Sequence, residues 1–281
     1  MSDVFVIARL ALQEAVRRRV LAVVAVLTVV SGVLYVIGCV SLKNHIHGLL
    51  EIGGGVVKPI VPATLLGLAS FGTLFLGSVL AVFLTAGAVR GDVDRGLVQP
   101  LVVRPVGRGA YLAGRALAAI VVSGGYVVVI SLLATAVTRV VFDQLPSGAW
   151  SALPDLVGAV CIVTTLTLLM SCLLSTVATG ISVLMAYGAG LIAGLLGEVG
   201  RAFGATTVTR IANTVSYLLP FEALYRDALS RLSPAGPLAQ LVQLGPLGGA
   251  RAGGVGLWVF AVGYLVACLL VAAWLFGRSD L

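Results

Sequence analysis

The sequence predicts an all-α membrane protein with six transmembrane helices, and three observations carry this prediction. Of the 281 residues, 59% are hydrophobic and only 10% are charged, whereas soluble domains contain about a quarter charged residues. The mean hydropathy is +1.12. Uncharged stretches of about 20 residues, the length that crosses a bilayer as a helix, recur along the chain. Soluble enzymes and nucleic-acid-binding proteins are therefore excluded, and the net charge of +7 is attributed to membrane orientation.

The first 19 residues predict an amphipathic helix that lies at the membrane interface. Val4, Ala8 and Ala11 fall near one helical face, whereas Arg9 and the basic run 17–19 fall elsewhere. This division is typical of interfacial helices. Because a basic segment precedes the first long apolar run, we interpret that run as a span and not as a cleaved signal peptide.

Five uncharged runs predict the six transmembrane helices of a single domain that covers residues 1–281. The run 156–197 contains 42 residues without a charge, and as one straight helix it would measure about 63 Å, about twice the hydrocarbon thickness. It is therefore predicted to form a hairpin that breaks near Ser175, Thr176 and Gly180. The predicted spans are 20–40, 63–89, 116–138, 156–174, 180–197 and 252–277.

The positions of Lys and Arg predict that both termini lie in the cytoplasm, because cytoplasmic loops carry an excess of these residues. With the N-terminus inside, the short outer loops contain only Lys43, Lys58 and Arg139. The inner side then holds ten arginines, namely Arg9, Arg17, Arg18, Arg19, Arg90, Arg95, Arg104, Arg108, Arg115 and Arg278. We expect a multi-pass protein of the cytoplasmic (inner) membrane.

The outer segment 198–251, between the fifth and sixth spans, is predicted to contain one amphipathic helix. Phe221, Leu224, Tyr225 and Leu229 recur at helical spacing behind Pro220, a residue type that is common at the start of helices. We interpret these five residues as an outer gate that seals an apolar exit. The alternative is a fixed brace at the membrane interface.

The opposite face of the same helix is polar. Its sequence predicts two ion pairs at a spacing of four residues, Glu222 with Arg226 and Asp227 with Arg231. These four side chains are expected to stay in water. Glycines from Gly245 onward are expected to let the helix move.

The chain carries no recognisable catalytic or nucleotide-binding motif. The patterns GxxxxGK[ST], GxSxG and HExxH are absent from the sequence, so no catalytic residue is assigned and the energy source is expected in another protein. His45 and His47 have no evident third ligand, which favours solvated loop histidines over a metal site. No cofactor and no metal are expected on this chain.

The spans are predicted to be free of buried charge. Asp155, Glu198 and Arg139 are placed at the ends of spans, within reach of water. Ion-coupled carriers and ion channels keep charged groups inside the membrane, so both classes are disfavoured.

Small and hydroxyl-bearing residues within the spans are assigned to packing. The pattern of Gly190 and Gly194, followed by Gly197, predicts close contact between helices. Serines at membrane depth are expected to bond to carbonyls of their own helix. The cysteines are interpreted as unpaired, buried apolar side chains; they are Cys39, Cys161, Cys172 and Cys268.

The inner loop 90–115 is the most informative part of the sequence. It combines glycine, proline and charge around a short apolar run from Leu97 to Val103. A short apolar helix can insert into a groove of a soluble protein while neighbouring charges contact the rim. The alternative is a basic loop that only fixes the topology. The candidate docking residues are Asp92, Asp94, Arg95, Gly96, Leu97, Val98, Leu101, Arg104 and Pro105.

This loop resembles the loop between the second and third spans of ABC-2 type transporter permeases. There an acidic residue and a glycine precede a short coupling helix, and a proline and basic residues follow. The N-terminal helix is similar to the elbow helix of that family, and the tail 276–280 to its short basic-acidic end. The matching loop positions are Asp94, Gly96, Leu97 to Val103, Pro105, Arg108 and Arg115.

The resemblance implies the six-span permease subunit of an ABC exporter. Its partners would be two copies of a cytoplasmic ABC ATPase, which would hold ATP and Mg, and a second permease subunit in a homodimer or a related heterodimer, all in contact with membrane lipid and none with nucleic acid. The uncharged spans predict an apolar or amphipathic cargo, such as a lipid, a hydrophobic drug or a peptide. The alternatives are a non-transporting anchor or maturation factor for another enzyme, and an intramembrane lipid-modifying enzyme.

Overall fold

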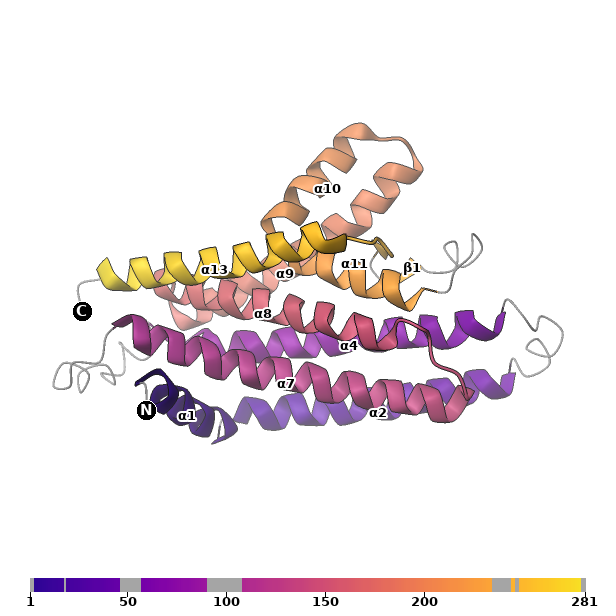
Figure 1. The fold of residues 1–281 in the computed structure, drawn as a ribbon, viewed down its shortest axis with the longest axis horizontal. Coiled ribbons are helices and arrows are strands. Elements are labelled where there is room, and N and C mark those ends of the chain that lie inside the picture. The colour runs from indigo at the N-terminus through magenta and orange to yellow at the C-terminus, as the bar shows by residue number, and fades with distance from the viewer. Residues whose placement is uncertain are drawn as a thin grey trace.

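The computed structural model describes residues 3–17, 19–45, 57–89, 108–233, 244–245 and 248–278. These residues form an all-helical fold apart from one antiparallel ladder of two-residue strands (Figure 1). The elements are α1 (Asp3–Arg17), α2 (Arg19–His45), α4 (Val57–Thr85), α7 (Arg108–Phe142), α8 (Ala149–Leu173), α9 (Thr176–Ala202), α10 (Thr206–Leu218), α11 (Phe221–Leu232), β1 (Leu244–Gly245), β2 (Gly248–Gly249) and α13 (Gly254–Arg278).

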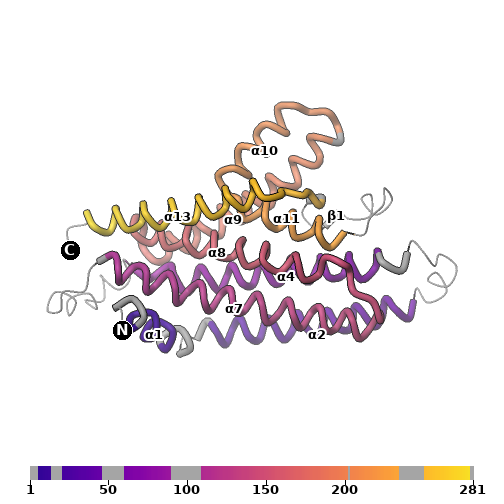
Figure 2. Tube along the Cα trace, viewed as in Figure 1, coloured from indigo at the N-terminus to yellow at the C-terminus, as the bar shows by residue number. Residues whose placement is uncertain are grey.

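Six of the described helices are long and apolar enough to cross a membrane, which confirms the predicted number of spans. They are α2, α4, α7, α8, α9 and α13. The predicted break in the uncharged run 156–197 is also confirmed, because α8 ends at Leu173 and α9 begins at Thr176. The long helices lie side by side along the long axis of the molecule (Figure 2).

Several helices extend past the predicted spans. The largest difference is α7, which has 35 residues and includes Arg108 and Arg115 near its start and Arg139 near its end. An uncharged run stops at the first charged residue, whereas the hydrogen bonds of a helix continue into the polar region. Charge therefore marks where a helix leaves the hydrocarbon and not where it ends.

Helices α4 and α8 form the centre of the bundle, and α2 and α13 lie at its edges. Leu74 of α4, Val127 of α7 and Val160 of α8 are completely buried within one apolar core. Gly77 allows α4 to approach α7 closely, because a Cβ atom at this position would lie 2.8 Å from Cγ2 of Val127. This contact is an example of the small-residue packing that joins helices in membranes.

The N-terminal helix α1 and the last turn of α13 lie at the same end of the bundle (Figure 1). Ala8 and Ala11 of α1 are buried together with Ala118 of α7, while Val6 and Leu10 are exposed. The helix is therefore present as predicted; its location at a membrane interface stays a prediction.

The end of the bundle that carries both termini also holds the residues that flank the inner loop. Val89, the last described residue before that loop, packs in one cluster with Leu112 of α7 and Phe276 of α13. The ring of Tyr111 stacks on that of Phe276 in this cluster, with a centroid distance of 6.2 Å. This cluster, which we call the apolar platform, therefore contains residues from both sides of the inner loop.

Helix α10 and the end of α9 form a hairpin that projects from the side of the bundle (Figure 1). The two helices pack on each other through glycines, since a Cβ atom at Gly197 would lie 3.2 Å from Cβ of Ala212. Gly204 has a φ of +66° at the connection, a conformation that suits glycine. The outer segment thus contains a second helix, α10, where the sequence predicted only one.

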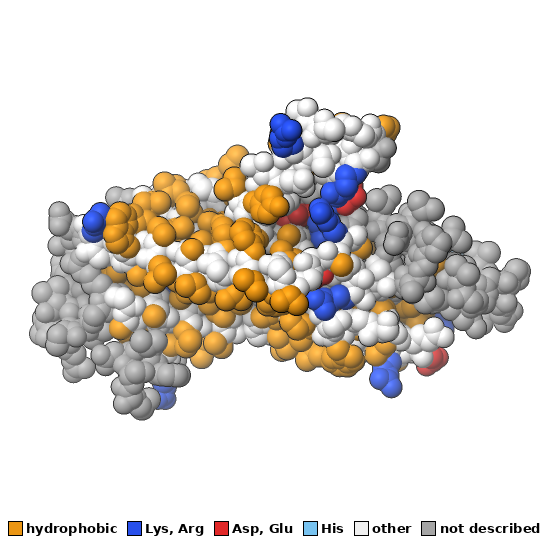
Figure 3. Space-filling model, turned by 45° about the horizontal axis from the view of Figure 1, so that its top comes forward, with side chains coloured by type: hydrophobic (Ala, Val, Ile, Leu, Met, Phe, Trp, Pro, Cys, Tyr) orange, Lys and Arg blue, Asp and Glu red, His pale blue; other side chains and the backbone are white. Residues whose placement is uncertain are grey.

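Apolar side chains cover the outside of the bundle, as expected for a surface in lipid. Hydrophobic residues extend along the body in Figure 3, whereas acidic and basic side chains gather at the base of the hairpin. Helix α2 presents a continuous exposed face made of Val23, Val26, Val29, Val30, Val33, Leu34 and Ile37.

Candidate functional site

Helix α11, which holds the predicted gate residues, is packed inside the protein. Phe221, Leu224 and Tyr225 are each no more than 1% exposed, and Leu229 is 6% exposed. Pro220 directly precedes the first helical residue. The helix packs mainly on α8 and also contacts α4, α9 and α13. The structure brings the five predicted gate residues into one buried region; their role as a gate stays a prediction.

Aromatic contacts fix the apolar face of α11. The ring of Phe221 stacks on Tyr187 of α9, with a centroid distance of 4.8 Å and an angle of 11° between the planes. The ring of Tyr225 lies 6.1 Å from Phe71 of α4. Each aromatic pair of this kind contributes about 0.5–1.5 kcal/mol beyond the burial of its area. These contacts join α11 to two different spans.

The glycine pattern of α9 provides the seat for the start of α11. A Cβ atom at Gly190 would lie 2.7 Å from Cζ of Phe221, and one at Gly194 would collide with Oε1 of Glu222. The packing role predicted for these glycines is therefore confirmed. The two glycines allow both the ring of Phe221 and the carboxylate of Glu222 to lie close to the backbone of α9.

Seven charged residues, four of them buried, form a group around α11, which we call the charge cluster. Part of it joins α11 to α9: Nε of Arg226 lies 3.1 Å from Oε1 of Glu222, and its Nη2 atom pairs with Glu198. Arg201 also pairs with Glu198, at 2.5 Å. The members of the charge cluster are Asp155, Glu198, Arg201, Glu222, Arg226, Asp227 and Arg231.

The other part of the charge cluster joins α11 to α8 and to the start of α13. Nε of Arg231 lies 2.7 Å from Oδ2 of Asp155, and its Nη2 atom lies 2.9 Å from Oδ2 of Asp227. The indole N–H of Trp258 donates a hydrogen bond of 2.9 Å to Oδ1 of Asp155, and the backbone N–H of Gly253 donates one of 2.9 Å to Oδ1 of Asp227. The groups that contact these two buried carboxylates therefore come from α11 and from the region where α13 begins.

The charge cluster confirms the two predicted pairs within α11, Glu222 with Arg226 and Asp227 with Arg231. The prediction that this polar face stays in water is wrong, because Glu222, Arg226 and Asp227 are between 1% and 6% exposed. The reason is that α8 and α9 supply complementary charges. Burial of a charged group is costly in the absence of such partners.

The placement of Asp155 within reach of water is also wrong. Its side chain is completely buried, and it lies in the second turn of α8, a helix that can span the membrane. Glu198 is partly exposed, with 27% of its side chain accessible. The described spans therefore contain a buried carboxylate, and it is held by Arg231.

Burial is the largest influence on the pKa of Glu222 and raises it above the ordinary value. Arg226 and the hydrogen bond from Ser216 oppose this shift because both favour the carboxylate. The charge of Glu198 adds to the increase, and that of Arg201 opposes it. Glu222 therefore takes up a proton more readily in the folded protein than an exposed glutamate does.

Two hollows lie at the base of the hairpin. One has a volume of about 420 Å³ and is bounded by α10, α11 and the start of α13; its lining includes Glu222, Arg226 and Arg251. The other, of about 480 Å³, lies along α10 and the end of α9 and includes Arg201 and Arg210. Glu222 and Arg226 are the members of the charge cluster that line the first hollow.

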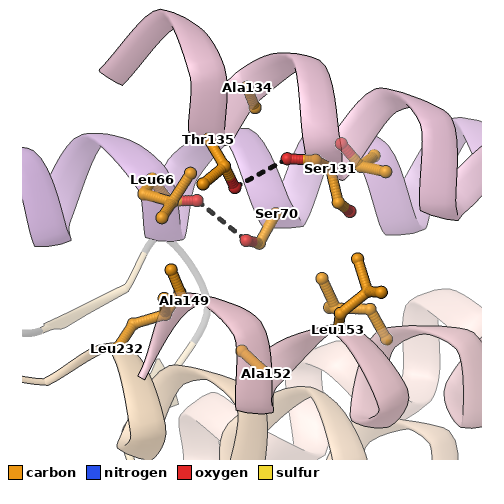
Figure 4. A pocket seen from close by; sticks show the side chains of 11 residues that line it. Leu66, Ser70, Ser131, Ala134, Thr135, Ala149, Ala152, Leu153 and Leu232 are labelled. Carbon is orange, nitrogen blue, oxygen red and sulfur yellow. Dashed lines mark hydrogen bonds between the residues drawn. The ribbon is translucent and has the colours of Figure 1, made fainter. Parts of the chain in front are cut away.

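A small polar void lies inside the bundle between α4, α7 and α8. Ser70, Ser131 and Thr135 line it together with apolar side chains, and Figure 4 shows Ser70 and Thr135 bonded to carbonyls of their own helices. Its volume of about 10 Å³, measured for the centre of a water-sized sphere, is close to the minimum that can hold one water molecule. It is too small for a cargo molecule.

Hydroxyl groups in the spans bond mainly to carbonyls of their own helices, as predicted. Ser70, Thr85 and Thr167 are examples, with distances of 2.7–2.8 Å to the carbonyl four residues earlier. Hydroxyl groups also bond between spans, for example Ser123 of α7 with Thr164 of α8 at 3.2 Å, and such bonds contribute about 0.6 kcal/mol on average.

The candidate docking residues lie outside the described residues, so their structural role stays a prediction. They are Asp92, Asp94, Arg95, Gly96, Leu97, Val98, Leu101, Arg104 and Pro105. The same holds for His47, whereas His45 ends α2 and its ring lies 3.2 Å from the carbonyl of Ser41. Within the described parts of the chain, no group of three His, Cys, Asp or Glu residues could hold a metal. The four cysteines are unpaired, as predicted.

The sequence interpretation missed α10 and the partnership of Asp155. A signal for α10 exists, because Val208, Ile211, Ala212 and Val215 recur at helical spacing. No comparable signal joins Asp155 to its partner on α11. The two residues are far apart in the chain, and only the packing of α11 against α8 brings them into contact.

Comparison with known proteins gives one family. A family model described as ABC-2 family transporter protein matches residues 5–281, which includes all six candidate spans and the region around α11. This match implies a membrane protein with several spans and, in general, an ABC ATPase as its partner. No curated protein matches the chain.

Proposed function

Because the chain belongs to the ABC-2 family of transporter proteins, we propose that it is the transmembrane permease subunit of an ATP-driven exporter. The observation that carries this proposal is the family match over residues 5–281 together with six helices long enough to span a bilayer. ATP is hydrolysed by a separate ATPase subunit, and this chain is not itself an enzyme. ATP and Mg are held by that subunit.

The proposed assembly contains two ATPase copies and two permeases, as a homodimer or a related heterodimer. The ATPase docks on the inner loop, through the residues from Asp92 to Pro105. Two observations support this site. The apolar platform of Val89, Leu112 and Phe276 contains residues from both sides of the loop. The start of α7 and the end of α13 lie at the end of the bundle with both termini (Figure 2). This end is the cytoplasmic one in the proposed orientation.

The proposed cargo is apolar or amphipathic and moves outward or between leaflets. The supporting observation is that many polar groups in the described spans are bonded within the protein. Hydroxyls such as Thr85 and Thr167 bond to their own helices, and Asp155 is paired with Arg231. A hydrophilic cargo would need polar groups that replace its hydration, since each unsatisfied group in hydrocarbon costs several kcal/mol.

Helix α11 is the proposed outer gate. Its apolar face, with Phe221, Leu224, Tyr225 and Leu229, closes the bundle beside α4, α8 and α9. Opening would separate the charge cluster, so the charged pairs hold the closed position. A fixed brace is the competing role for the same contacts.

The experiment that tests the proposed function uses the chain co-expressed with an ABC ATPase that co-purifies with it. Both are purified through a tag on the permease and reconstituted into liposomes that contain fluorescent lipids. The expected result is ATP-dependent movement of lipid between leaflets and stimulation of the ATPase. A catalytically inactive ATPase variant is the control for passive movement.

The docking site is tested in the same system. Replacing Leu97 and Leu101 with Asp places charge on the apolar face of the predicted coupling helix, so co-purification of the ATPase should be lost while the permease keeps its thermal stability. Replacement of both residues with Met preserves apolar volume and should retain the partner. Retention of a stimulated ATPase by the Asp variant would reduce the loop to a topological connector.

A further inference from the structure

The hollow of about 420 Å³ at the base of the hairpin, which we call the base cavity, has the properties of a ligand site. Its volume falls in the range of about 300–1,000 Å³ that is usual for small-molecule pockets. Asn213 and Arg251 provide polar lining, while Leu257 and Phe260 provide an apolar side. The cavity therefore offers two chemically different surfaces to one ligand.

The charges around the base cavity leave one positive charge available. Arg226 and Glu222 line the cavity but pair with each other, and Glu198 and Arg201 complete this group with one further charge of each sign. Arg251 is exposed, and no carboxylate of the described residues pairs with it. Its backbone N–H donates a hydrogen bond of 3.2 Å to the carbonyl of Arg226, which fixes its position at the cavity.

The apolar side of the base cavity continues onto the outside of α13. Phe260 is 41% exposed, and its ring meets that of Tyr217 edge-on with a centroid distance of 6.1 Å. Val255 and Val259 are 80% and 69% exposed on the same helix. Helix α13 spans the membrane, so an apolar chain can run from the cavity along its surface. Figure 3 shows charged side chains next to this hydrophobic surface.

We infer that the base cavity binds the phosphodiester of an anionic amphiphile of the phospholipid type, with the phosphate on Arg251 and Asn213 and the acyl chains along Leu257 and Phe260. A guanidinium is well suited to a phosphate because it donates several N–H groups in a planar array. One net positive charge matches the single negative charge of a phosphodiester. The inference concerns binding and holds whether or not the bound molecule is transported.

The test measures lipid binding to the purified full chain in detergent by native mass spectrometry, with phosphatidylglycerol and phosphatidylcholine as probes. Two variants act on the site by different routes. Arg251→Gln removes the charge, and Gly256→Leu fills the cavity without a clash, because a Cβ atom at Gly256 would have no neighbour within 4 Å. Each is expected to weaken binding of phosphatidylglycerol about tenfold or more.

Matched controls separate the site from general effects. Arg210→Gln removes an arginine from the outer surface of α10, and Gly263→Leu adds a side chain to open space on α13; binding should change less than about twofold in both. Arg251→Lys should retain part of the affinity because it keeps the charge. Thermal melting of each variant establishes that it is folded.

The outcomes decide between the sources of the phosphate. Equal losses in Arg251→Gln and Arg210→Gln would indicate general charge attraction and overturn the inference, as would equal binding of the two lipids. Displacement of the lipid by excess inorganic phosphate, together with normal phosphate binding by Gly256→Leu, would identify a site for free phosphate and overturn the lipid assignment.

Discussion

The guanidinium of Arg231 and the carboxylate of Asp155 join α11 to α8, with 2.7 Å between Nε and Oδ2. Asp155 is completely buried, whereas 34% of the Arg231 side chain is exposed. The two partners are therefore not equivalent. Loss of the arginine would leave two buried carboxylates, Asp155 and Asp227, close to each other without a counter-charge.

Arg231→Met is consequently expected to destabilise the protein more than Asp155→Asn. The expected cost is about 2 kcal/mol, less than is usual for a fully buried pair because the arginine is partly exposed. Asp155→Asn leaves Arg231 paired with Asp227 at 2.9 Å and keeps the acceptor for Trp258, so a cost of about 1 kcal/mol or less is expected. Thermal melting in detergent measures both, and a larger shift for Asp155→Asn would contradict this account.

Gly194→Ala should displace α11 from α9, because the added Cβ atom would collide with Oε1 of Glu222. Overpacking of this kind costs about 1–3 kcal/mol. Gly188→Ala on the same helix is the matched control, since a Cβ atom there meets nothing within 4 Å. Alanine is a better helix former than glycine, so this variant should be as stable as the parent. Similar melting temperatures for the two variants would argue against a close contact between Gly194 and Glu222.

Stability should depend on pH through Glu222. Its pKa is raised in the folded protein, so the folded state binds more protons than the unfolded state between the ordinary pKa of about 4.3 and the raised value. The contribution of Glu222 to stability is therefore greatest at low pH, and it is lost as the pH rises through this window. Subtracting the melting profile of Glu222→Gln from that of the parent isolates this contribution. The melting temperature of the parent should fall relative to that of Glu222→Gln as the pH increases. A relative rise of the parent would show that the folded protein favours the carboxylate.

Both termini are predicted to lie in the cytoplasm. A cysteine introduced at Gly107, in the inner loop, should be inaccessible to a membrane-impermeant maleimide added to intact cells, whereas a cysteine at Gly54 should be labelled. The native cysteines are unpaired, so both variants are made in a background in which they are replaced. The reverse labelling pattern would invert the topology.

A disulfide across the hairpin distinguishes a gate from a brace. Cβ atoms at Gly197 and Ala212 would lie 3.2 Å apart, slightly less than the mean of about 3.8 Å in disulfides, so Gly197→Cys with Ala212→Cys should cross-link α9 to α10. If α10 and α11 move together during transport, oxidation stops transport while ATP binding by the partner persists, and reduction restores it. Unchanged transport in the oxidised protein would assign α11 to a brace.

The spans could be predicted from the sequence because each depends on local properties. An uncharged run has to become a helix in hydrocarbon, where backbone groups have no water to bond. The break after Leu173 followed in the same way from a run too long for one crossing. The pairing of Glu222 with Arg226 also follows from helical periodicity alone.

The surroundings of α11 were decided by tertiary structure. Periodicity shows which residues share a face of a helix, and it leaves open whether water or protein lies opposite that face. Glu222 and Arg226 were expected in water, but Glu198 of α9 and the glycines beside it form a complementary surface. Asp155 and Arg231 are 76 positions apart, and their contact exists because α11 is buried against α8. Charge complementarity between distant segments is a property of packing, so no local pattern in the sequence records it.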